Sequence, residues 1–126
     1  EAQNLVKTVH YPGLATHRDF QLQQEQASGA GAVLSFELVD EELLAAFVQA
    51  VKLPVFAVSL GAVESILSYP AKMSHAAIPR DEREKRGITN SLLRLSVGLE
   101  NPDDLIQDFS QALEACTAQI STGASV

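Results

Sequence analysis

The segment 92–100, which reads LLRLSVGLE, most strongly constrains the fold because its apolar and polar residues alternate. Every second residue from 93 to 99 is leucine or valine, whereas Arg94 and Ser96 lie between them. Side chains on a β-strand point to opposite faces in turn, so these two sets lie on opposite faces. We therefore expect a strand with one face in the core and a guanidinium on the other face.

Arg94 has two possible roles on such a strand. A guanidinium that a stiff strand holds in a fixed orientation suits a carboxylate, because its planar fork donates two parallel hydrogen bonds. Alternatively, Arg94 lies on the solvated face of a sheet that is covered on one side only, where exposed arginines are ordinary. The pattern alone leaves both interpretations open.

The composition indicates one small domain. The chain has 126 residues, and its hydrophobic fraction of 46% is enough for a single core. A net charge of −7 disfavours nucleic acid as a partner, because phosphate binding relies on clustered lysine and arginine. No apolar run approaches the roughly 20 residues that cross a bilayer. The single cysteine, Cys116, agrees with a reducing compartment, so we expect a cytoplasmic protein without a membrane partner.

The remaining periodicities predict alternating strands and helices. Strands are predicted at residues 5–10, 32–39 and 55–59 and around Arg94. Helices are predicted at residues 16–27, 40–53 and 81–86 and from Pro102 onward, with a short helical turn near 63–67. The predicted class is α+β, a two-layer domain whose mainly antiparallel four-stranded sheet is covered by helices on one face. We expect this domain over residues 1–116 and a disordered tail over 117–126.

The other side chains that could carry chemistry are expected to have structural roles. The three histidines lack the spacing of metal ligands, so no metal site is expected. Cys116 lies on an apolar helical face and is expected to pack rather than react. The aspartates at 103, 104 and 108 are expected at the start and on the solvated face of a helix. Ser59 lacks the Gly-x-Ser-x-Gly pattern of a serine nucleophile, so the residues alone favour a capping role.

Five motifs follow one another along the chain. They are VHYPGL at 9–14, GAGAVLSF at 29–36, AVSLGAVES at 57–65, YPAKMSHA at 69–76 and LLRLSVGLE at 92–100. Together they resemble the pyridoxal-phosphate enzymes of cysteine and methionine metabolism, which include cystathionine β- and γ-lyases, cystathionine γ-synthase and methionine γ-lyase. The resemblance runs from about Asn4 to Ala115 without a large gap. It implies the small C-terminal domain of a fold-type I enzyme that depends on pyridoxal 5′-phosphate (PLP).

The resemblance also implies roles for four residues. Arg94 matches the family arginine that binds the substrate α-carboxylate. Ser59 matches a catalytic serine whose hydroxyl helps to hold the Schiff-base lysine, and the backbone of Ser59 and Leu60 lines the substrate site. Val58 stands where members specialised for the γ-carbon of cystathionine often carry an acidic residue. An aliphatic residue at this position is similar to the pattern of methionine γ-lyases and bacterial cystathionine β-lyases. The amino-acid sequence of the surrounding motifs favours the β-lyases.

The cofactor machinery of the family is not found in this sequence. None of the four lysines lies in the family's lysine motif, and the phosphate site is missing too. We therefore expect PLP to be bound by an upstream domain and the fragment alone to be inactive. The chain starts at Glu1 without an initiator methionine, which favours the interpretation that it is part of a longer protein. The other implied partners are a sulfur amino-acid substrate and further copies in a homotetramer.

The implied reaction of the complete protein is the cleavage of cystathionine to homocysteine, pyruvate and ammonia. Two alternatives remain. One is methionine or cystathionine γ-lyase, or γ-synthase, of the same family. The other is a non-catalytic α+β module that binds a small acidic metabolite or another protein through Arg94 and the open face of the sheet.

Overall fold

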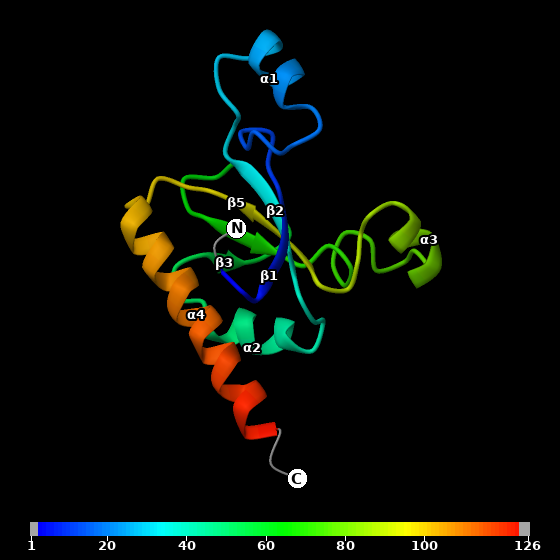
Figure 1. The fold of residues 1–126 in the computed structure, drawn as a ribbon, viewed down its shortest axis with the longest axis vertical. Coiled ribbons are helices and arrows are strands. Elements are labelled where there is room, and N and C mark those ends of the chain that lie inside the picture. The colour runs from blue at the N-terminus through cyan, green and yellow to red at the C-terminus, as the bar shows by residue number, and fades with distance from the viewer. Residues whose placement is uncertain (1–2, 124–126) are drawn as a thin grey trace.

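A computed structural model describes residues 3–123, which form five strands and four helices (Figure 1). The strands are β1 (Val6–His10), β2 (Val33–Leu38), β3 (Val55–Phe56), β4 (Ile66–Ser68) and β5 (Leu92–Ser96). The helices are α1 (Phe20–Gln26), α2 (Leu43–Ala50), α3 (Arg80–Lys85) and α4 (Pro102–Gly123). The strands form one sheet in the order β1-β2-β5-β4-β3, in which only β3 and β4 are parallel. The predicted α+β class is confirmed.

Three predicted elements differ from the structure. The helical turn expected near 63–67 is wrong, because Ile66–Ser68 is the strand β4 and the sheet has five strands instead of four. This strand is too short to show periodicity, and its pairing with β5 decides its conformation. The strand expected at 55–59 ends at Phe56, so residues 57–65 leave the sheet. The last helix continues to Gly123, which differs from the disordered tail expected over 117–126, of which residues 124–126 lie outside the described part of the chain.

The two faces of the sheet differ as the alternation in β5 predicts. On one face, Phe36 and Leu93 are cross-strand partners and pack with α2 and α4 in the buried core. The phenylalanine rings at 36, 47 and 109 meet edge to face, with centroids 5.6–6.0 Å apart. Cys116 belongs to this core, and burial raises the pKa of its thiol, so the packing role predicted for it is confirmed. Arg94 lies on the opposite face, beside its cross-strand partners on β2 and β4.

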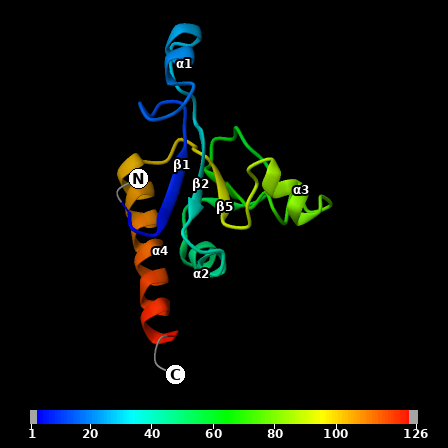
Figure 2. The ribbon, with the colours of Figure 1, turned by 45° about the vertical axis from the view of Figure 1, so that its right-hand side comes forward.

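Helices α3 and α1 lie away from this core. The strands separate α3 from α4, and α1 projects beyond the ends of β1 and β2 (Figures 1 and 2). None of the α1 side chains is buried. The covered face is therefore made by α2 and α4 alone.

Asp108 joins α4 to the end of α2. Its carboxylate accepts hydrogen bonds from the backbone N–H groups of Lys52 and Leu53, at 2.8–3.1 Å, and from the Gln111 amide at 3.0 Å. The residue is buried, so the expectation of a solvated position for Asp108 is wrong. The helical period places it toward the core, and the donors come from a segment distant in sequence.

We expect Asp108→Ala to lower the free energy of unfolding by about 2–4 kcal/mol, because two backbone N–H groups lose their acceptor in a partly buried place. Urea-induced unfolding measures the change. Glu114→Ala is the matched control, because Glu114 is exposed on the same helix. Equal destabilisation by the two variants would contradict a specific role for the Asp108 carboxylate.

Candidate functional site: the polar face of strand β5

Two side chains on the polar face of β5 bind the segment 57–65. Nη2 of Arg94 donates a hydrogen bond to the carbonyl oxygen of Ser59 at 2.8 Å. The hydroxyl oxygen of Ser96 accepts a hydrogen bond from the N–H of Gly61, also at 2.8 Å. The structure therefore brings the Arg94 guanidinium and the Ser59 carbonyl together, although 35 positions separate them in the sequence.

The Arg94 guanidinium keeps donors for a further partner. Its Nε atom is buried and has no hydrogen-bond partner among the described residues. No carboxylate within residues 3–123 forms an ion pair with it. Its cross-strand neighbours are Ser35 and Ser68, whose side chains are short and carry no charge. A guanidinium without a carboxylate partner among the described residues suits a ligand that carries a carboxylate.

The other predicted site residues flank this contact. Val58 and Leu60 are large apolar side chains that are exposed on either side of Ser59. The Ser59 hydroxyl forms no hydrogen bond within the part of the chain that the structure describes, so no capping role is observed. The carbonyl oxygen of Ser59 makes the contact with Arg94, which leaves the hydroxyl for another partner. The segment thus presents a polar group between two apolar ones.

Glu100 is a residue of the site that sequence reasoning missed. Its carboxylate accepts hydrogen bonds from the N–H and the hydroxyl of Ser65, at 2.6 and 2.8 Å. These bonds hold the pKa of Glu100 below its ordinary value, because they stabilise the charged form of the carboxylate. The bond from the Ser65 backbone N–H has the largest effect. Glu100 closes the LLRLSVGLE motif, but nothing in the sequence identifies Ser65 as its partner.

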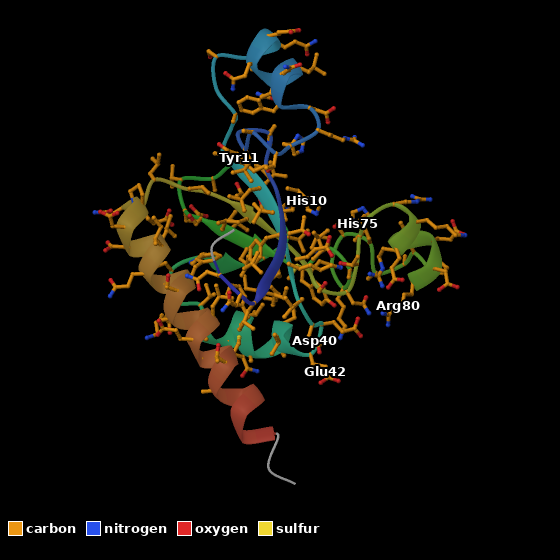
Figure 3. The ribbon with its side chains drawn as sticks, viewed as in Figure 1. His10, Tyr11, Asp40, Glu42, His75 and Arg80 are labelled. Carbon is orange, nitrogen blue, oxygen red and sulfur yellow. The ribbon has the colours of Figure 1, made fainter. Side chains whose placement is uncertain are left out.

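The remaining candidates for chemistry lie elsewhere. His10 is on β1, where its Nε2 lies 3.2 Å from Oε1 of Glu37. His75 is in the segment before α3, where its Nδ1 lies 2.8 Å from the Ser74 hydroxyl oxygen (Figure 3). No group of three or more His, Cys, Asp or Glu residues within 3–123 could hold a metal ion. A cavity of about 810 Å³ lies between β1 and residues 16–19 and is lined by none of the predicted site residues. No helix in this range is long and apolar enough to cross a membrane.

The lysines do not form a PLP site. All four lysines are exposed. Lys7 lies 3.9 Å from Glu37, and Lys85 lies 2.9 Å from Glu82. A lysine that binds a cofactor covalently is activated by burial or by a neighbouring cation, and these two are solvated beside carboxylates. The surroundings of Lys7 and Lys85 therefore do not fit PLP.

The family model and the most similar relatives all belong to the enzymes of cysteine and methionine metabolism. The family described as "Cys/Met metabolism PLP-dependent enzyme" matches residues 1–114. The chain is 66% identical over 109 residues to cystathionine beta-lyase MetC of Bacillus subtilis, which covers 86% of this chain and 28% of that protein. It is 48% identical over 109 residues to cystathionine gamma-lyase of the same organism, covering 86% and 29%.

A solved structure of similar fold is cystathionine gamma synthase from Xanthomonas oryzae pv. oryzae in complex with cystathionine. Its TM-score is 0.88 and its sequence identity 42%, and the match covers 93% of this chain and 30% of that one. The chain therefore spans less than a third of the length of these relatives.

Proposed function

Because the chain belongs to the family of Cys/Met metabolism PLP-dependent enzymes, we propose that it is the C-terminal domain of a carbon–sulfur lyase. In this proposal the domain binds the α-carboxylate of a sulfur amino acid. The longer protein acts as a homotetramer in the cytoplasm. Its PLP, with the lysine that binds it, is held outside this chain.

The Arg94 guanidinium is the observation that carries the proposal. It is fixed on β5, it is bound to the Ser59 carbonyl, and its buried Nε–H has no acceptor among the described residues. A substrate carboxylate supplies a negative charge and acceptors for the exposed N–H groups of the guanidinium. Binding there fixes one end of the amino acid, so that its side chain extends past the exposed residues of segment 57–65.

Ser59 contributes a second function through its other oxygen. Its carbonyl is occupied by Arg94, whereas its hydroxyl is free to hold the amine of a catalytic lysine from the rest of the protein. Leu60 and Val58 line the substrate site beside it. In this proposal the hydroxyl affects turnover, and the carbonyl affects substrate binding.

We propose cystathionine as the substrate and cleavage of its Cβ–S bond as the reaction. With one water consumed, the products are homocysteine, pyruvate and ammonia. The 66% identity to a cystathionine beta-lyase supports this choice, as does the aliphatic Val58. Cleavage or replacement at the γ-carbon is the alternative, supported by the likeness to gamma-lyase and gamma synthase. Both reactions require the same carboxylate contact.

Borohydride reduction of the longest natural form of the protein tests the cofactor proposal. We expect visible absorbance before reduction and, after proteolysis, one pyridoxyl-lysine peptide that lies outside residues 1–126. The 126-residue chain is the control and is expected to stay unlabelled and without lyase activity. A colourless, unlabelled full-length protein would overturn the proposal and favour the non-catalytic binding module.

A further inference from the structure

The segment 57–65 has little apolar contact to hold it in place. Val58, Leu60 and Val63 expose 62%, 55% and 70% of their surface. Hydrophobic burial therefore contributes little to the position of Ser59, although its carbonyl must meet Arg94 within hydrogen-bond distance. Polar contacts in the middle of the segment and at its end at Ser65 must supply this order.

A chain of hydrogen bonds fixes the end of the segment. Oε1 of Glu100 accepts from the N–H of Ser65 at 2.6 Å, and Oε2 accepts from its hydroxyl at 2.8 Å. The same hydroxyl oxygen accepts from the N–H of Gly98 at 2.9 Å. Ser65 is fully buried, so water does not compete for its N–H and hydroxyl, whereas the Glu100 carboxylate is half-buried. Hydrogen bonds to an ionised acceptor are stronger than bonds between neutral groups.

Gly98 allows the two backbones to approach closely. A Cβ atom at this position would overlap the backbone of residues 63–65. The N–H of Leu99 also donates to the carbonyl of Val63 at 2.8 Å. The strand that carries Arg94 and the segment that carries Ser59 are therefore joined directly after β5.

We infer that Glu100 and Ser96 are positioning residues for the substrate carboxylate. Glu100 acts through Ser65 at the end of the segment, and Ser96 acts through Gly61 in its middle. Together they set the distance between the Ser59 carbonyl and the Arg94 guanidinium, and hence the direction of the remaining guanidinium donors. This inference rests on the proposed function, because it assigns the two residues to the same carboxylate site.

A pair of inhibitors tests the role of Glu100 in the full-length protein. Norleucine carries an α-carboxylate, and pentylamine is the same molecule without it. We expect Glu100→Gln to weaken inhibition by norleucine about tenfold, because the amide loses one of the two bonds to Ser65, and to change inhibition by pentylamine less than twofold. Asp104→Asn removes the same charge from an exposed position nearby and is expected to change neither constant.

The possible outcomes separate this inference from the proposed function. Arg94→Lys belongs in the same assay and should also weaken norleucine selectively. If Arg94→Lys does so but Glu100→Gln affects both inhibitors equally, or neither, the positioning role is overturned and the proposed function stands. If Arg94→Lys has no selective effect, the carboxylate site itself is overturned. Should Glu100→Gln fail to fold, Ser96→Ala repeats the test without a change of charge, because it removes the acceptor of the Gly61 N–H.

Discussion

Arg94→Lys in the full-length protein is expected to raise KM for a sulfur amino acid by roughly 100-fold, with a much smaller effect on kcat. Lysine keeps the positive charge but presents a compact ammonium. It can reproduce neither the bond from Nη2 to the Ser59 carbonyl nor two further parallel bonds to a carboxylate. Steady-state kinetics, with the inhibition constant of norleucine as a measure of binding, gives the change.

Arg86→Lys is the matched control for this substitution. Arg86 is exposed at the end of α3 and forms none of the contacts of the site, so the same chemical change there should leave KM within about twofold. An unchanged KM for Arg94→Lys would show that charge alone is sufficient or that the carboxylate binds elsewhere. Either result would remove the bidentate assignment.

The alternation in β5 was enough to predict the position of Arg94. A period of two over several residues has one structural solution, and the structure places leucines of β5 in the core with Arg94 on the other face. Apolar residues that recur at helical spacing after residue 102 likewise predicted the helix α4. Its start is as expected, because the Asn101 side chain accepts a hydrogen bond from the N–H of Asp103 at 2.9 Å.

Features that depend on distant partners could not be predicted in this way. The strand β4 has three residues and exists because β5 and β3 pair with it. Asp108 has the composition of a solvated helix residue, and only the N–H groups that follow α2 explain its burial. The role of Glu100 likewise depends on its hydrogen bond with Ser65, which lies 35 positions away in the sequence. Each of these features depends on residues distant in the sequence, and no local pattern identifies those residues.

Ser59→Ala is expected to lower kcat about 30-fold and to leave KM and bound PLP nearly unchanged. The substitution removes the hydroxyl, which in our proposal holds the amine of the catalytic lysine. It keeps the backbone carbonyl that accepts the hydrogen bond from Arg94, so carboxylate binding should persist. Turnover, KM and the visible absorbance of the full-length protein are measured together, so that loss of cofactor is distinguished from loss of activity.

Ser74→Ala is a suitable control, because Ser74 is also exposed and its hydroxyl bonds only to the neighbouring His75, outside the site. Wild-type turnover in Ser59→Ala would contradict the role of the hydroxyl and leave Ser59 with its carbonyl contact alone. A rise in KM without a fall in kcat would instead mean that the segment 57–65 moves when the side chain is lost. If the hydroxyl and the carbonyl of Ser59 have separate roles, Ser59→Ala should change mainly kcat and Arg94→Lys should change mainly KM.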